Sequence, residues 1–184
     1  MCLFSQRKTL KKVLVVGLTA VLVMASVGLL PATAQQAQSN KDVVIVSSDE
    51  QVLMETVNGQ RIDHGLAPLS WNEQLYQAAH AKADHLFQEQ YFDHIAPDGT
   101  TPWAFFRAAN YTYKSAGENL AIDFSTLTDA VPAWMNSPSH RANILNPDFT
   151  DTAMAVVYGH MDGQETTAVV QLFGEPMRPF LALK

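Results

Sequence analysis

The sequence predicts an α+β sandwich in which helices pack around a small antiparallel sheet. Three observations support this fold class. Four stretches carry helix signals in their apolar spacing and end residues, three carry strand signals, and the last two strand stretches are separated by a loop rich in turn-forming residues. Helices grouped beside an antiparallel hairpin are typical of α+β domains.

The first two helices are each predicted from a capping box. Residues 48–51 (SDEQ) begin helix one, because the Ser48 hydroxyl can accept from the third helical amide and Gln51 can reach back. This helix is expected to end at Gly65 in a left-handed conformation, with the next residue folding back on the last turn. Residues 70–73 (SWNE) begin helix two, whose apolar stripe recurs every three to four residues at Leu75, Ala79, Ala83 and Leu86.

Two shorter helices and three strands complete the prediction. Residues 102–109 form the third helix and residues 126–135 the fourth, in which Pro132 implies a late start or a bend. The strands are predicted at residues 117–122, 153–158 and 166–173. Residues 159–164 connect the last two strands into an antiparallel hairpin.

The N-terminal 34 residues are predicted to be an export signal. Basic residues precede an apolar run at 13–30, and Pro31 is followed by small residues of the signal-peptidase type at 32–34. An uncleaved anchor helix is the alternative, because this run is near the lower limit for crossing a bilayer. Residues 35–47 are then a polar linker, 48–174 the folded domain and 175–184 a C-terminal tail. The domain is therefore expected to be secreted or held in the cell envelope, with membrane contact only through an uncleaved N-terminal segment.

Composition excludes several functional classes. The chain has 184 residues, 47% hydrophobic and 16% charged, with a formal net charge of −6, and it is too apolar for a disordered protein. Residues 1–34 hold four basic residues and no acidic one, so eight basic and 18 acidic groups remain, a net charge of −10. This charge repels phosphate backbones, and nucleic acid is not an expected partner. Since the only cysteine is Cys2, the domain is predicted to have no disulfide and no thiolate nucleophile.

Three residues are candidates for chemistry, because the motifs of the common hydrolases and nucleotide-binding proteins do not occur in the sequence. His94 lies just past helix two, Glu118 enters a strand where glutamate is uncommon, and His140 is the third residue of a short helix that begins after Ser137. A helix start favours a neutral imidazole, as a metal ligand or a general base requires. Two histidines and a carboxylate are a frequent zinc ligand set. The alternatives are a surface loop histidine at 94, a water-facing edge glutamate at 118 and a turn-bonded histidine at 140.

Two further histidines are interpreted as surface residues. His80 and Asp84 share a face of helix two at a spacing of four residues, and so do His85 and Glu89. Such pairs are usually solvated helix contacts. Neither histidine is therefore predicted to be a ligand.

Several motifs together resemble the CAP superfamily, which includes cysteine-rich secretory proteins, venom antigens and plant pathogenesis-related proteins. Parts of the domain are similar to the opening of a bacterial member, at residues 58–61 (NGQR), 69–71 (LSW) and 92–94 (FDH). Others are similar to its two signatures and its closing strand, at residues 117–121 (GENLA), 134–147 (WMNSPSHRANILNP) and 170–174 (VQLFG). The resemblance covers residues 48–174 in the same order.

The resemblance implies an α-β-α sandwich with a cleft lined by two histidines and two glutamates. His94 and His140 are similar to the two histidines and are the implied ligands of zinc or another divalent cation, and Glu118 is similar to the first glutamate and is the implied catalytic group. Ser137 lies near the place of the second glutamate, so the family's set of four is incomplete here. The cleft is expected to include Glu118, Asn119, Ser137 and Asn143.

The expected function is that of an extracellular ligand-binding domain without an established reaction. Its cleft would take a divalent metal, a lipid, another small ligand or a component of the envelope. One alternative is a metal-assisted hydrolase of peptides or cell-wall polymers with Glu118 as the base, and another is a structural envelope protein whose histidines only order loops. The missing second glutamate disfavours hydrolysis, because no separate acid remains to protonate the leaving group.

Overall fold

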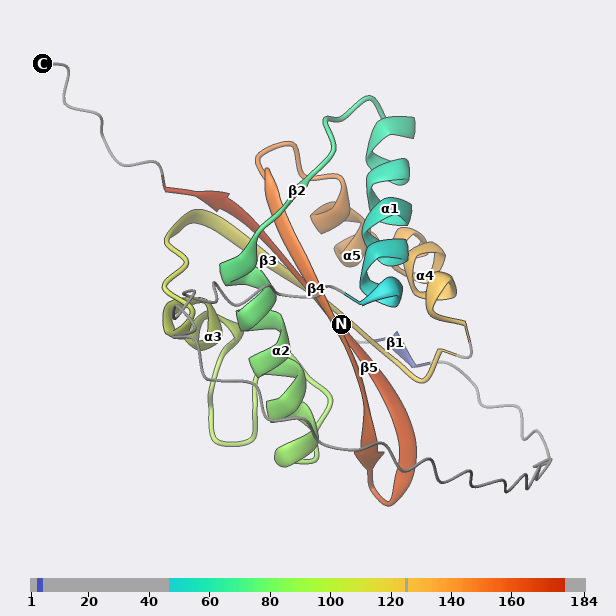
Figure 1. The fold of residues 1–184 in the computed structure, drawn as a ribbon, viewed down its shortest axis with the longest axis vertical. Coiled ribbons are helices and arrows are strands. Elements are labelled where there is room, and N and C mark those ends of the chain that lie inside the picture. The colour runs from blue at the N-terminus through green and yellow to red at the C-terminus, as the bar shows by residue number, and fades with distance from the viewer. Residues whose placement is uncertain (1–2, 5–46, 125, 178–184) are drawn as a thin grey trace, which may run out of the picture. The chain divides into compact units, whose positions relative to one another are not determined.

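Three long antiparallel strands form the centre of the fold. In the computed structural model, which describes residues 3–4, 47–124 and 126–177, β5 (Gln164–Pro176) pairs with β3 (Tyr113–Ile122) on one side and β4 (Asp151–Met161) on the other. The two-residue strands β1 (Leu3–Phe4) and β2 (Ser70–Trp71) add to the edges in parallel, giving the order β1-β3-β5-β4-β2 (Figure 1). The predicted α+β class is confirmed, and the sheet is mixed only because of these two short strands.

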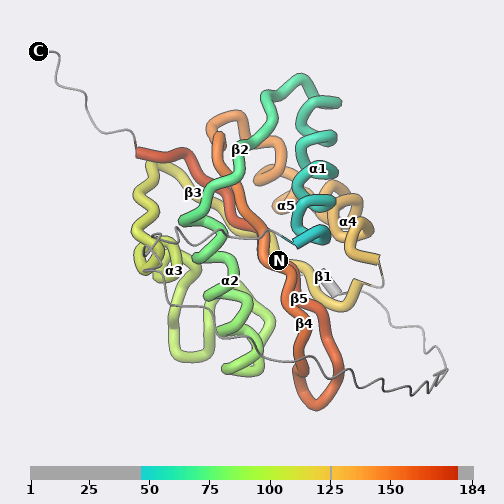
Figure 2. Tube along the Cα trace, viewed as in Figure 1, coloured from blue at the N-terminus to red at the C-terminus, as the bar shows by residue number. Residues whose placement is uncertain are grey.

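Helices cover both faces of the sheet, as the α-β-α sandwich requires. α2 (Glu73–Gln88) and α3 (Pro102–Ala108) lie on one face (Figure 1). α1 (Ser48–Asp63), α4 (Ala130–Asn136) and α5 (Pro138–Ile144) lie on the other, as the tube in Figure 2 also shows.

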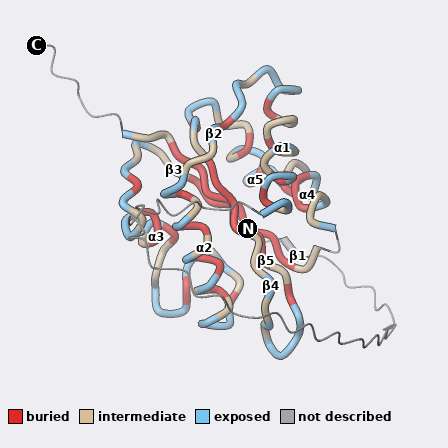
Figure 3. The backbone as a smooth tube through the Cα atoms, in the orientation of Figure 1, coloured by how far each residue is buried: buried red, intermediate tan, exposed pale blue. Residues whose placement is uncertain are grey.

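The core consists of two clusters, one on each face of the sheet. Neighbouring strand residues point to opposite clusters: Leu120 packs with the α2 side and Ala121 with the α1 side, and Leu172 and Phe173 divide in the same way. The centres of all three long strands are therefore buried on both faces (Figure 3). Burial on both faces explains the apolar runs at residues 153–157 of β4 and 168–170 of β5, whereas β3 has Glu118 and Asn119 among its apolar residues.

The start of α1 differs by one residue from the prediction. The capping box is formed by Ser47, whose hydroxyl accepts from the Glu50 amide at 3.2 Å while Glu50 Oε2 accepts from the Ser47 amide at 2.9 Å. The predicted box from Ser48 to Gln51 is wrong, because two adjacent serines are each followed by a suitable acceptor three residues later.

The end of α1 is confirmed. Gly65 has φ +76°, the Leu66 amide donates to Arg61 O at 2.9 Å, and the Gly65 amide donates to Ile62 O at 2.9 Å. These two backbone hydrogen bonds, with the left-handed glycine, form the predicted helix stop and close the last turn.

The start of α2 and the hairpin loop also differ from prediction. Asn72 caps α2 by accepting from the amides of residues 74 and 75, whereas Ser70, the predicted cap, lies in β2. The expected loop 159–164 is only a tight turn at Asp162 and Gly163, both with positive φ, as a two-residue hairpin of this type requires.

The last two helices follow the proline signals. The stretch predicted as helix 126–135 is a 3-10 turn (Leu127–Asp129) followed by α4, which contains Pro132 in its first turn. α5 begins with Pro138 after the N-cap residue Ser137, as predicted.

The predicted export signal or anchor, the linker up to residue 46 and the tail after residue 177 lie outside the described residues, apart from residues 3–4. Within the described ranges, no helix combines the length and hydropathy needed to cross a bilayer.

Candidate functional site

A cavity of about 350 Å³ contains two of the three candidate residues. Its walls come from the segment after α2, the start of α3, strand β3 and one residue of α5. The lining residues are His94, Ile95, Thr101, Pro102, Trp103, Ala116, Gly117, Glu118 and Asn143. The cavity therefore combines an ionisable pair with an apolar wall that includes Trp103, 36% exposed, and Ile95, 55% exposed.

Glu118 and His94 form a short hydrogen-bonded pair in this cavity. Glu118 Oε1 lies 2.6 Å from His94 Nδ1, and the two side chains are 2% and 30% exposed. The other carboxyl oxygen, Oε2, is buried and has no hydrogen-bond partner among the described residues. The water-facing edge glutamate considered from the sequence is therefore not what the structure shows, because β3 turns this side chain inward.

Burial raises the pKa of Glu118 above its ordinary value of 4.5. The hydrogen bond with His94 and the charge of Lys82 oppose this rise, and Asp93 adds to it. A carboxyl whose pKa is raised by desolvation keeps its proton to a higher pH than an exposed one.

Asn143 connects the cavity wall to α5. Its Nδ2 donates to Glu118 O at 3.1 Å and to Asn119 Oδ1 at 2.9 Å, and Asn119 Nδ2 donates to His140 O at 3.3 Å. Asn119 is fully buried and does not line the cavity. Of the four predicted cleft residues, Glu118 and Asn143 line the cavity, and Asn119 and Ser137 do not.

His140 does not line the cavity that holds Glu118 and His94. It occupies the third position of α5, as predicted, but it is only 2% exposed and its Nδ1 contacts Ser137 Oγ at 2.8 Å. The Ser137 hydroxyl thus bonds the imidazole and not a backbone amide of the helix start. This geometry matches the turn-bonded histidine, the alternative for position 140.

The predicted metal site stays a prediction from the sequence. Nowhere in residues 3–4, 47–124 and 126–177 do three or more His, Cys, Asp or Glu side chains come together to hold one ion. His94 Nδ1 faces Glu118 and His140 Nδ1 faces Ser137, so these two ring nitrogens already have partners within the protein. A zinc or other divalent ion would therefore need the other ring nitrogens of His94 and His140, together with Glu118.

Lys82 is a buried residue behind the site that the sequence patterns do not predict. Lys82 in α2 is 0% exposed and its ammonium lies against the segment that carries His94. A lysine in a helix is usually solvated, but Lys82 is seven residues after Leu75 and three after Ala79, inside the apolar stripe. This position was the signal that could have identified it.

The two histidines interpreted as surface contacts have partners outside their own helix turn. His80 Nε2 lies 3.0 Å from Glu50 Oε1, a carboxyl of α1 whose residue is 1% exposed. His85 Nδ1 lies 3.0 Å from the Tyr91 hydroxyl. In the folded protein, both imidazoles contact oxygen atoms of other segments. The spacing of four residues within the helix does not predict these contacts.

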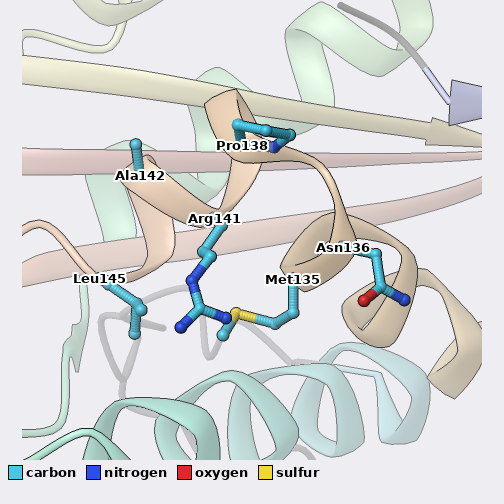
Figure 4. A pocket seen from close by; sticks show the side chains of 6 residues that line it. All are labelled: Met135, Asn136, Pro138, Arg141, Ala142 and Leu145. Atoms are coloured by element: carbon cyan, nitrogen blue, oxygen red, sulfur yellow. The ribbon is translucent and has the colours of Figure 1, made fainter.

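A second hollow of about 430 Å³ lies beside α4 and α5 (Figure 4). It is lined by Met135, Asn136, Pro138, Arg141, Ala142 and Leu145. Its one charged lining residue, Arg141, donates to His64 Nε2 at 3.0 Å. Among the described residues, neither a carboxyl nor a predicted site residue lines this hollow, so the Glu118 cavity is the better candidate site.

Comparison with known proteins gives a consistent family match. Residues 54–173 match the family model described as the cysteine-rich secretory protein family (CAP). The chain is 38% identical over 128 residues to the uncharacterized protein YkwD of Bacillus subtilis, and 28% identical over 112 residues to the uncharacterized membrane protein YlbC of the same organism. These alignments cover 69% and 61% of this chain but only 50% and 32% of the relatives, so the chain spans half or less of their length.

Solved structures agree on the fold. An outer surface protein from Borrelia burgdorferi superposes with a TM-score of 0.62 at 24% identity, covering 73% of this chain and 97% of that one. An extracellular protein of Bacillus anthracis that contains an SCP domain superposes with a TM-score of 0.58 at 28% identity, covering 68% and 40%. The first likeness shows the α-β-α fold alone, because its identity is below 25%.

Proposed function

We propose, from the premise that this chain belongs to the cysteine-rich secretory protein (CAP) family, that it is an exported ligand-binding domain whose ligand occupies the cavity beside Glu118 and His94. Export is supported by the signal-like N-terminus and by the extracellular relative of known structure. Because the alignment covers only 50% of YkwD, any activity or partner assigned to the whole protein is also part of this proposal.

The observation that carries the proposal is the unpartnered Oε2 of Glu118 in a cavity with an apolar wall. A buried polar atom without a partner costs about 1–3 kcal/mol, so it is uncommon in a core that only has to be stable. A ligand with a hydrogen-bond donor would satisfy this oxygen. Trp103 and Ile95 would at the same time bury its apolar part.

The complementary ligand is therefore small and amphipathic, with an amine or hydroxyl group at one end. A carboxylate group is disfavoured, because it would approach Glu118 with like charge and no lysine or arginine of the described chain lines the cavity. The acidic balance of the domain also favours cations.

Three six-carbon probes that differ only in their head group test this proposal: hexylamine, hexanol and hexanoate. Each is titrated into the full chain at pH 8 while the indole N–H signal of Trp103 is followed by NMR. We expect saturation with hexylamine at a Kd on the order of 1 mM, equivalent to about −4 kcal/mol. Hexanoate should bind about tenfold more weakly or not at all.

Two variants assign the effect to the carboxyl. Glu118→Gln removes the charge but keeps the shape, and it should bring the affinities of hexylamine and hexanoate to within about threefold of each other. Glu55→Gln, which removes an exposed carboxyl of α1, is the matched control and should leave the preference intact. The proposal is contradicted if no probe gives a saturable shift, or if Glu118→Gln keeps the amine preference unchanged.

An acid–base hydrolase is the second candidate function. The observation that favours it is the 2.6 Å contact between a buried carboxyl with a raised pKa and an imidazole, an arrangement that can exchange a proton with a substrate. Turnover of peptidoglycan or of a peptide library that is abolished by Glu118→Gln, with the fold intact, would establish it. If neither turnover nor binding depends on Glu118, the structural envelope protein is the remaining alternative.

A further inference from the structure

Lys82 is a buried cation whose three N–H donors are all used. Its Nζ donates to the Tyr91 hydroxyl at 2.9 Å, to Asp93 O at 2.9 Å and to His94 O at 3.0 Å. The ammonium also lies 4.7 Å from the centre of the Tyr91 ring and 5.9 Å from that of Phe105. A lysine can be kept charged inside a protein only when its donors are satisfied in this way.

All three acceptors belong to residues 91–94, the segment that brings His94 to the cavity. This segment lies between α2 and α3 outside regular secondary structure. At its two ends, the Tyr91 amide donates to Leu86 O at 3.1 Å and the His94 amide donates to its neighbour Asp93 Oδ1 at 2.6 Å. Because Lys82 donates to the carbonyl of His94, it fixes the backbone position from which the imidazole side chain extends.

The network continues outward from Lys82 through Tyr91. Burial raises the pKa of Tyr91 to about 12, so its hydroxyl keeps its proton. That hydroxyl accepts from Lys82 and can donate to His85 Nδ1 at 3.0 Å. Tyr91 is thereby fixed on both sides, which restricts the start of the segment.

Core stability alone does not explain a lysine here. Position 82 lies in the apolar stripe of α2 between Ala79 and Ala83, where a methionine or leucine would fill a similar volume without burying a charge. Replacing buried charged groups by apolar residues of similar size is often neutral or stabilising. The three hydrogen bonds of this buried cation to Tyr91, Asp93 and His94 indicate that it holds residues 91–94 in place.

We propose that Lys82 is a positioning residue of the candidate site, which holds residues 91–94 in the one arrangement that places His94 Nδ1 against Glu118 Oε1. The inference rests on the proposed function only in that the Glu118–His94 pair is the ligand site. Lys82 itself does not line the cavity, so it acts through His94 and not on the ligand.

The proton shared between His94 Nδ1 and Glu118 Oε1 is the spectroscopic readout. A proton in a 2.6 Å hydrogen bond gives a downfield signal that exchanges slowly with water, and Glu118→Gln assigns it. The signal and its exchange rate are measured by NMR at pH 7 in the full chain without ligand. The matched control is Arg61→Lys, which perturbs a second buried cation, bonded to the carbonyls of Ala67, Ile144, Asn146 and Phe149.

Lys82→Met is expected to remove the shared-proton signal, or to speed its exchange about tenfold or more. The remaining signals should keep the dispersion of a folded protein. Tyr91→Phe keeps the lysine but removes one of its acceptors, and it should speed the exchange by a smaller factor. Arg61→Lys should leave the signal unchanged although it lowers stability.

Three results would overturn the inference: an unchanged signal in a folded Lys82→Met variant, an unchanged exchange rate in Tyr91→Phe, or an equal loss of the signal in Arg61→Lys. If Lys82→Met does not fold, the Tyr91→Phe and Arg61→Lys measurements decide alone. No probe molecule takes part, so a failure of ligand binding and a failure of this inference are distinguishable.

Discussion

Replacing Glu118 by glutamine is expected to change how the free energy of unfolding depends on pH. Burial raises the pKa of Glu118 above 4.5, so the folded protein keeps this proton at pH values where the unfolded chain has released it. Between 4.5 and the folded pKa, the folded state binds more protons than the unfolded state, and stability falls as the pH rises. Because glutamine does not titrate, the stability of the parent minus that of Glu118→Gln should fall through this window and be flat on either side.

The size of the effect follows from one proton. A single proton gives a slope of up to about 1.4 kcal/mol per pH unit inside the window. The substitution also replaces the carboxyl that is hydrogen-bonded to His94 by an amide, which changes stability by about 0.5–1.5 kcal/mol. Against a typical total stability of about 5–15 kcal/mol, a slope of this size is measurable.

Urea unfolding at pH steps from about 3 to 8 is the assay, and Glu50→Gln is the control with the opposite sign. Desolvation raises the pKa of Glu50, but hydrogen bonds from His80, Ser47 and Val156 together lower it below 4.5. Its contribution is present above pH 4.5 and is lost as the pH falls through the folded pKa, so the parent-minus-variant difference rises with pH. A flat or rising difference for Glu118→Gln would refute the reasoning from burial.

Three further substitutions test the packing of the fold and the cavity. Gly174→Ala would place a methyl group on the ring and hydroxyl of Tyr111, and it should cost at least about 1–3 kcal/mol in urea unfolding; unchanged stability would show that this contact is not formed. Gly163→Ala has open space around it but a φ of +75°, so it should cost only about 1 kcal/mol, and a loss as large as that of Gly174→Ala would contradict the hairpin geometry. Trp103→Ala removes a ring that packs on Phe106 and Tyr113, so it should lower stability by about 2–4 kcal/mol. In the folded variant, hexanol binding, followed on the Ala116 methyl signal, should weaken about tenfold, and an unchanged affinity would remove Trp103 from the site.

The sequence was sufficient for the fold, because local signals and tertiary packing agree in most elements. The Gly65 stop and the proline starts of α3 and α5 depend on residues close together in the chain. The errors at Ser47 and Asn72 are shifts of one or two residues between equally suitable capping residues. Short-range patterns do not separate such neighbours, because only packing decides which one starts the helix.

The site could be predicted only in part. Glu118 and His94 are both predicted and do meet, but the sequence could not show that His140 turns to Ser137 or that Lys82 is buried. Both depend on the direction in which a helix face points, which is set by contacts between residues far apart in the chain. The same reason explains the unexpected partner of His80, a carboxyl 30 residues earlier.

The most direct test of the ligand site is the place where hexylamine sits on the protein. Intermolecular NOEs between hexylamine and the full chain distinguish the two hollows, because Trp103 and Ala116 line one and Met135 and Leu145 line the other. We predict NOEs from the probe to Trp103 and Ala116 that become much weaker in Glu118→Gln at the same probe concentration. NOEs to Met135 and Leu145 instead, or NOEs to Trp103 that are equally strong in Glu118→Gln, would contradict the assignment of the Glu118–His94 cavity as the ligand site.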